Sequence, residues 1–124
     1  MMFDWGDYFV LAEDWALCGG EAHKRSAISR AYYCVYNRAR QLLERDGVPV
    51  PDEGRAHKVV WDTLEGRGKA RRRLGLDGNA LRELRRRADY ESNLMHVHRE
   101  AQKAMAMARS MMRLLDAEMD AGTH

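Results

Sequence analysis

The sequence predicts an all-α protein, an up-and-down bundle of four to five helices. Apolar residues recur every three or four positions along most of the chain, which is the spacing of a helix face rather than of a strand. Gly and Pro gather in short stretches around 19–20, 47–54, 66–68 and 75–78. A chain of 124 residues is long enough to bury one core without disulfide or metal support, so we expect a single helical domain over residues 1–124.

The first two helices are predicted at about 5–17 and 22–46. The first has an apolar stripe and is expected to stop at Gly19 and Gly20, which can adopt a left-handed conformation. The second is predicted to be the central helix and to stop in the same way at Gly47. Its continuous apolar face consists of Ile28, Ala31, Tyr32, Val35, Ala39, Leu42 and Leu43.

A third helix is predicted after Pro51, with Asp52 as its N-cap and with Gly66 as its end. The residues that it should turn inward are His57, Val60, Trp61 and Leu64. We expect the next segment, 67–78, to be a mobile loop, because its glycines and charges leave little apolar area to bury.

The fourth helix is predicted at about 80–90, capped by Asp77 or Asn79, and the fifth at about 92–120. The fifth carries a seam suited to a neighbour that packs nearly antiparallel, formed by Leu94, Val97, Ala101, Ala104, Ala108, Met111 and Leu115. The methionines of this segment are interpreted as adaptable core and interface residues, which hint at a partner helix.

Several classes of protein are disfavoured by composition. Cys18 and Cys34 lack the close spacing of a zinc or thioredoxin-like motif, and we assign neither a catalytic role. No run approaches the roughly 18 apolar residues that cross a bilayer, and the acidic N-terminal segment is unlike a signal peptide. The sequence therefore predicts a cytoplasmic protein that does not bind membranes.

Positive charge is concentrated in one segment. Residues 67–87 contain nine Lys or Arg and two acidic residues, a net charge of +7, whereas the whole chain carries +2. Arg82, Arg85 and Arg86 share one helix face, and guanidinium groups can bind phosphate through two parallel hydrogen bonds. A solvated charged face is the simpler interpretation. Because no acid is expected to pair with these cations, we favour a polyanionic partner such as RNA or a nucleotide.

Asp89 and Tyr90, which follow these arginines, allow two interpretations. In one, Asp89 pairs with a neighbouring Arg, and Tyr90 packs on the core with its hydroxyl at the surface. In the other, Asp89 fixes one guanidinium, and Tyr90 is a hydrogen-bond donor or a base-stacking ring beside the arginines. Both interpretations leave Arg85 available for phosphate.

The histidines do not predict a metal site. His96 and His98 lie two positions apart, so on a helix they would point about 200° away from each other. His57 is interpreted as a structural histidine with a satisfied ring, whereas His96 draws interest because it closely follows the arginines. The sequence contains no glycine-rich phosphate loop, nucleophile elbow or zinc-protease motif, and we expect no cofactor.

Three segments together resemble the HEPN domain (higher eukaryotes and prokaryotes nucleotide-binding). They are SRAYYCVYNRAR at 29–40, HKVV at 57–60, and LRELRRRADYE at 81–91, so the resemblance spans most of the chain. It implies an all-α bundle of four to five helices that usually forms a homodimer. Many members of this family are metal-independent endoribonucleases of toxin–antitoxin, CRISPR and other defence systems, and others bind nucleotides without cleaving.

The resemblance places the catalytic Arg of the family at Arg85. Active members have a His after four to six intervening residues, but here Tyr90 occupies the matching position, and no His in the chain follows an Arg at that spacing. A tyrosine is mostly protonated at pH 7 and is a poor general base. The remaining candidates for a base are Asp89 and His96.

Three functions stay open from the sequence. The first is an RNA- or nucleotide-binding protein that uses Arg82, Arg85, Arg86, Tyr90 and His96, and the resemblance implies a nucleotidyltransferase-like partner, as in related family members. The second is an active endoribonuclease toxin in which Arg85 acts with Tyr90, Asp89 or His96. The third is a structural interaction module whose methionine-rich helix docks a partner and whose arginines bind an acidic protein surface.

Overall fold

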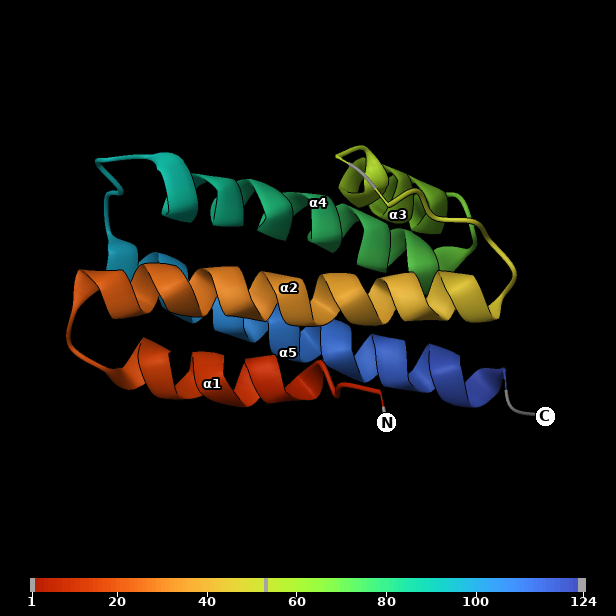
Figure 1. Ribbon diagram of the computed structural model, residues 1–124, viewed down its shortest axis with the longest axis horizontal. Coiled ribbons are helices and arrows are strands. Elements are labelled where there is room, and N and C mark those ends of the chain that lie inside the picture. Colours follow the sequence, from red (N-terminus) through yellow and green to blue (C-terminus); the bar gives the residue numbers. More distant parts are fainter. Residues whose placement is uncertain (1, 53, 123–124) are drawn as a thin grey trace.

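The computed structural model describes residues 2–52 and 54–122, within which the chain forms five helices and no strands (Figure 1). The prediction of an all-α bundle is therefore confirmed. The helices are α1 (Gly6–Leu17), α2 (Glu21–Arg45), α3 (Ala56–Glu65), α4 (Lys69–Tyr90) and α5 (Val97–Ala121). Among them, none is both long and apolar enough to cross a membrane.

Four helices, α1, α2, α4 and α5, run along the long axis of the molecule and alternate in direction (Figure 1). As predicted, α2 is the central helix, because it packs against all four other helices. The short helix α3 packs mainly on α4, at the end of the bundle where the connection from α2 arrives (Figure 1). This arrangement leaves the C-terminal end of α4, towards Tyr90, without α3 beside it (Figure 1).

The core follows the predicted faces. Every residue of the predicted α2 face is fully buried. Trp61 of α3 has the largest side chain among the fully buried residues that the structure describes. Leu81 and Leu84 hold the second half of α4 on the core. Burial of a leucine side chain of this kind contributes about 2 kcal/mol, so these contacts fix the position of the arginines between and beside them.

The two predicted glycine stops have different outcomes. Gly47 does adopt the left-handed conformation, with φ of 80°, and ends α2 as predicted. The prediction for Gly19 and Gly20 is wrong, since neither has a positive φ. Instead, the buried ammonium of Lys24 donates hydrogen bonds to the carbonyl oxygens of Ala16 (2.9 Å) and Cys18 (2.7 Å), which satisfies the end of α1.

The predicted mobile loop at 67–78 is wrong, because α4 already begins at Lys69 and Leu74 is fully buried. The glycines of this segment permit close packing between helices. A Cβ atom on Gly78 would lie 2.2 Å from the Trp61 ring, and one on Gly75 would lie 2.4 Å from the Trp61 carbonyl oxygen. The contact with α3 thus overrides the low helix propensity of glycine.

The predicted caps of α4 are wrong for the same reason. Asp77 and Asn79 lie inside the helix, where Asp77 accepts a hydrogen bond from Arg73 (3.0 Å) and Asn79 donates one to Asp62 (3.2 Å). Both residues thus use their side chains on neighbouring side chains rather than on a helix end. The Asn79 contact joins α4 to α3.

The predicted starts of α3 and α5 are also wrong. Asp52 does not cap α3, which begins at Ala56, because its carboxylate instead pairs with Arg40 at 2.8 Å. Helix α5 begins at Val97 rather than near residue 92, after His96 in a left-handed conformation with φ of 58°. Leu94 is buried ahead of the helix and anchors this connection to the core.

Candidate functional site

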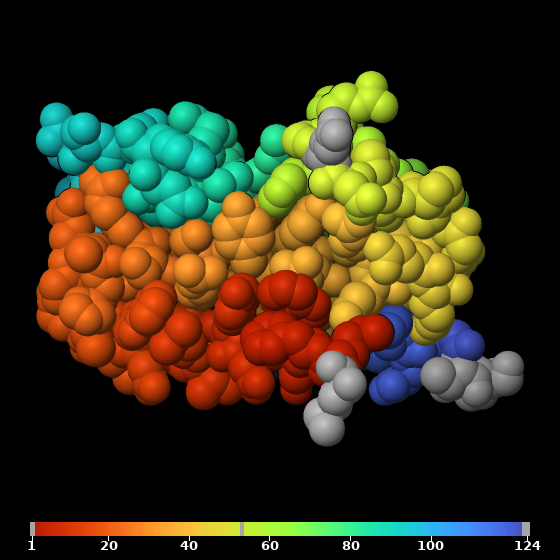
Figure 2. Space-filling view, in the orientation of Figure 1, coloured from red at the N-terminus to blue at the C-terminus, as the bar shows by residue number. Residues whose placement is uncertain are grey.

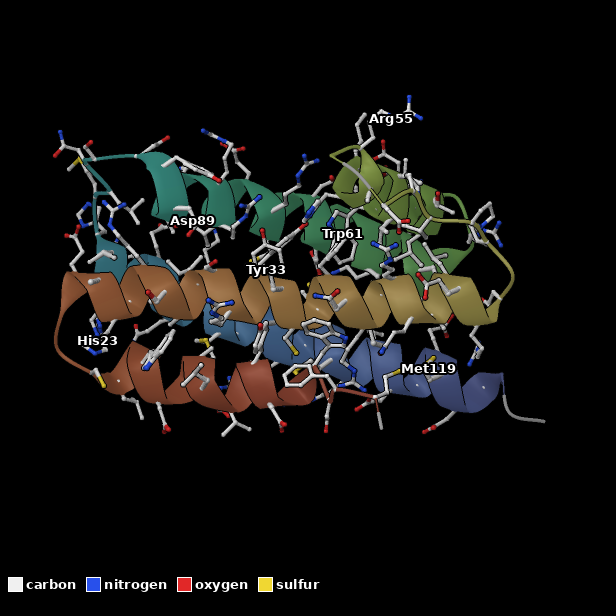
Figure 3. The ribbon with its side chains drawn as sticks, in the orientation of Figure 1. His23, Tyr33, Arg55, Trp61, Asp89 and Met119 are labelled. Atoms are coloured by element: carbon white, nitrogen blue, oxygen red, sulfur yellow. The ribbon has the colours of Figure 1, made fainter. Side chains whose placement is uncertain are left out.

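A polar and aromatic cluster lies where α2, α3 and the second half of α4 meet. Helix α2 supplies Ser29, Tyr32, Tyr33 and Tyr36, which recur every three or four residues and therefore share one side of the helix. Figure 3 shows Tyr33 rising from α2 towards α4, with Trp61 of α3 and Asp89 of α4 on either side of it. We call these residues the Arg85 cluster. Its members are Ser29, Tyr32, Tyr33, Tyr36, His57, Trp61, Arg82, Arg85 and Asp89.

Arg85 stands at the centre of the cluster. Its guanidinium carbon lies 5.4 Å from the centre of the Tyr32 ring and 5.5 Å from that of Tyr33, within the range of cation–π attraction. Only 12% of the side chain is exposed. Nε is buried and has no hydrogen-bond partner among the described residues. The attraction between the guanidinium and the two ring faces offsets part of the free energy lost when Arg85 is dehydrated.

The outer edge of Arg85 contacts Asp89. Nη1 lies 3.3 Å from Oδ2 of Asp89, and the hydroxyl of Ser29 lies 3.4 Å from the same oxygen. The prediction that Asp89 contacts one of the guanidinium groups is therefore confirmed. Both contacts are long for charge-assisted hydrogen bonds, which are typically 2.7–2.9 Å, so this pair leaves hydrogen-bonding capacity on Arg85.

A hydrogen-bond chain links the buried core to His57. The indole N–H of Trp61 donates to the Tyr32 hydroxyl oxygen at 3.1 Å, and that hydroxyl lies 2.6 Å from Nδ1 of His57. If the Tyr32 hydroxyl donates to Nδ1, the indole N–H, the hydroxyl and Nδ1 all have partners, and the proton of His57 lies on Nε2. The His57 ring also stacks on Tyr36, with ring centres 4.1 Å apart.

The pKa values of Tyr32 and His57 keep both side chains uncharged at pH 7. Burial lowers the pKa of His57, and with the positive charges of Arg82, Arg85 and Arg40, which act in the same direction, brings it to about 4. Burial also raises the pKa of the Tyr32 hydroxyl well above its ordinary value, although the hydrogen bond from Trp61 opposes this. At pH 7, His57 is therefore an uncharged ring that can offer the N–H of Nε2 as a donor.

Arg82 is the least constrained cation of the cluster, since it makes no hydrogen bond or ion pair with any described residue. It lines a hollow of about 450 Å³, which we call the α4 hollow. The other residues of its wall are Asn79, Glu83, Arg85 and Arg86. All the residues of this wall belong to α4, and Figure 2 shows an indentation of the surface between α3 and the second half of that helix.

The prediction that the arginines lack paired acids is wrong for most of them. Arg86 pairs with Glu83 at 2.7 Å, and Arg87 lies 3.7 Å from Glu91. Arg85 has its contact with Asp89. The reason is that acids three and four residues away lie on the same helix face as the arginines. Of the three arginines in that prediction, Arg82, Arg85 and Arg86, Arg82 alone is unpaired within the described residues.

Tyr90 and His96 do not join the cluster. Tyr90 is the last residue of α4 and is 73% exposed, so the interpretation in which it packs on the core is wrong. It makes no hydrogen bond or ring contact with any described residue. His96 lies on the exposed connection to α5, and no contact joins it to Arg85. Neither residue has a hydrogen bond, ion pair or ring contact with Arg85 in the described part of the chain.

The sequence analysis interpreted His57 as a structural residue and gave the tyrosines of α2 no role in binding. A signal for both was present in the hydroxyl-bearing residues at 29, 32, 33 and 36, which repeat at helical spacing beside an apolar face. Such a stripe would be expected to face a polar site. In the described part of the chain, no group of three or more His, Cys, Asp or Glu residues could hold a metal ion.

Comparison with known proteins gives no relative. No protein-family model matches this chain, and neither the curated proteins nor the solved structures include one with significant similarity.

Proposed function

We propose that this protein is a HEPN-like protein that binds RNA or a nucleotide, with a phosphate group held by Arg82 and Arg85 in the α4 hollow. The observation that carries the proposal is the position of Arg82, which borders the α4 hollow and makes no hydrogen bond or ion pair with any described residue. Arg85 lies on the same wall and has unused hydrogen-bonding capacity. Two adjacent guanidinium groups are suited to the oxygens of one phosphate.

The surroundings of the arginines support an anionic ligand. The electrostatic effect of both cations reaches His57, where it disfavours a further positive charge. A phosphate would relieve the repulsion between Arg82 and Arg85, and the half-buried position would strengthen its attraction to both. Helix α2 supports Arg85 from below with two tyrosine rings, so the guanidinium is held in place before a ligand arrives.

The geometry favours binding over cleavage of RNA. Cleavage needs a base near the ribose 2′-hydroxyl. Tyr90 is exposed at the end of α4, and Nδ1 of His57 is engaged by Tyr32. Asp89 is already in contact with Arg85 and Ser29. The endoribonuclease alternative remains open to a direct test, in which RNA is cleaved by the wild type and left intact by Arg85→Ala.

The proposal can be tested with a labelled single-stranded oligoribonucleotide and fluorescence polarisation at several salt concentrations. Arg82→Ala and Arg85→Ala should each weaken binding about tenfold or more, which corresponds to about 1.4 kcal/mol. Each should also reduce the slope of log affinity against log salt by about 0.7, the value for one phosphate contact on a single strand. If the protein cleaves RNA, expression of the wild type should arrest cell growth.

Arg113→Ala is the matched control, because Arg113 is an exposed arginine of α5 that has no ion pair among the described residues. It should leave the affinity almost unchanged. If Arg113→Ala weakens binding as much as Arg82→Ala does, the contact is diffuse and the α4 hollow is not the site. Absence of any affinity at low salt would favour the protein-interaction module instead.

A homodimer, which the resemblance implies, stays a prediction. Several large apolar side chains are exposed on the chain, among them Val10 and Leu17 of α1 and Met95 before α5. Light scattering at high protein concentration should give twice the mass of 14.3 kDa. A monomer at every concentration would contradict the prediction.

A further inference from the structure

A second hollow adjoins the α4 hollow on the other side of Arg82. It has a volume of about 600 Å³, and we call it the α3 hollow. Its wall consists of Gly54, Arg55, Lys58, Val59, Asp62, Thr63 and Arg82. The two hollows share Arg82, and the hydrogen bond from Asn79 to Asp62 (3.2 Å) joins a wall residue of one to a wall residue of the other.

The two hollows differ in chemistry. The α4 hollow is lined by three arginines, Asn79 and Glu83, so it presents mainly N–H donors. The α3 hollow has a mainly apolar lining, to which Val59 and Thr63 belong. Lys58 is itself neutralised by Asp62 at 2.9 Å. Each wall holds three cationic side chains and one acidic side chain, so the difference lies in polarity rather than in charge. The more polar wall of the α4 hollow favours an anion, and the more apolar wall of the α3 hollow favours a flat, weakly polar group.

We propose that the two hollows hold adjacent parts of one single-stranded nucleotide ligand, with the phosphate in the α4 hollow and its base in the α3 hollow. This inference rests on the proposed function. Arg82 would lie between the two parts, where one guanidinium can bind a phosphate oxygen with its edge and face a base with its plane. Arg55 offers a second guanidinium at the rim of the α3 hollow.

The proposal excludes duplex RNA as the preferred ligand. In a duplex the bases are stacked and paired, and they cannot turn sideways into a hollow beside the phosphate. In a single strand a base is free to leave the stack. Contact between a base and the protein would also give nucleotides a higher affinity than polyanions without bases, such as inorganic polyphosphate.

The test compares an intact and an abasic strand of equal charge, and adds a duplex that carries more charge but whose bases are paired. An oligoribonucleotide of about eight nucleotides, the abasic phosphodiester of the same length, and the corresponding duplex are titrated against the full chain. The intact single strand should bind about tenfold more tightly than the abasic strand, which is the effect of about 1.4 kcal/mol of base contact. The duplex should bind more weakly than the single strand.

Val59→Asn is the informative variant, because it makes the wall of the α3 hollow polar without changing charge. It should reduce the tenfold difference between the intact and abasic strands to about threefold or less. Val10→Asn makes the same substitution on an exposed residue of α1 and should leave the difference at its wild-type value. Circular dichroism on both variants checks that they fold.

The outcomes separate this inference from the proposed function. Equal affinity for intact and abasic strands, with binding still dependent on Arg82 and Arg85, would overturn the base-binding hollow and leave phosphate binding in place. Unchanged discrimination in Val59→Asn would also overturn it. If no ligand binds even at low salt, the proposed function itself fails, and the inference fails with it.

Discussion

The two ends of α4 use arginine in opposite ways. Near its start, Arg71 donates to Asp46 (2.6 Å) and to Glu118 (2.8 Å), and Arg45 contacts the same Asp46 (2.9 Å). We call these four residues the clasp, which joins the ends of α2 and α5 to α4. Near the other end, Arg85 has one long contact with an acid, and Arg82 has none among the described residues.

The comparison teaches that the number of arginines in a segment does not locate a binding site. Arg71 and Arg85 are similarly enclosed, with 15% and 12% of their side chains exposed. The difference lies in their partners. Two carboxylates at short distances use the hydrogen-bonding capacity of Arg71 on the fold itself, whereas aromatic rings hold Arg85 without using its donors.

The largest expected effect is on the clasp. Arg71→Ala would leave Asp46 and Glu118 partly buried without their shared cation and should lower the free energy of unfolding by about 2 kcal/mol, measured by urea denaturation. Affinity for RNA should stay at the wild-type value. Arg72→Ala, next along the helix and exposed, should change stability by less than about 0.5 kcal/mol. Comparable losses in both variants would contradict the distinction.

The next effect concerns pH and the Arg85 cluster. His57 has a pKa of about 4 in the folded protein, against 6.5 for an ordinary histidine, so the unfolded chain takes up the proton first. Its contribution to stability is complete above pH 6.5 and is lost as pH falls from 6.5 to 4. Because the ring is partly exposed, we expect a loss of about 1–2 kcal/mol over this range.

His57→Gln should remove this part of the pH dependence, as measured by urea denaturation at several pH values. The clasp contributes in a different window, because Arg71 and Arg45 lower the pKa of Asp46 and its contribution is lost only below about pH 4. His23→Gln, which changes an exposed histidine of α2, should keep the wild-type dependence. A pH profile unchanged in His57→Gln would show that burial of this ring does not govern its protonation.

The smallest expected effect is a gain in affinity. Asp89→Asn removes the carboxylate that competes with phosphate for Arg85 but keeps an acceptor for Ser29. Affinity for the single-stranded oligoribonucleotide should rise about threefold, or by about 0.7 kcal/mol. Asp116→Asn serves as the control, because it removes a carboxylate of α5 that pairs with Arg38 of α2. Weaker binding in Asp89→Asn would show that this carboxylate positions Arg85 for the ligand.

Much of the fold could be predicted from periodicity, because burial of an apolar face decides the position of a helix. The α2 face is fully buried as predicted, and Gly47 ends the helix as predicted. The segment 67–78 could not be predicted, because its glycines are explained only by the Trp61 ring that lies against them. Local composition indicates a loop there, and a contact with α3 decides otherwise.

The candidate site divides in the same way. The sequence by itself determined that the segment carries concentrated positive charge and that Asp89 contacts one of the arginines, whereas the structure identified that arginine as Arg85. Only the tertiary structure decided that Arg82 borders two hollows, that tyrosines of α2 support Arg85, and that His57 joins them while Tyr90 does not. The physical reason is that charge spacing along one helix is local, whereas counter-ions, ring contacts and desolvation come from helices distant in the chain.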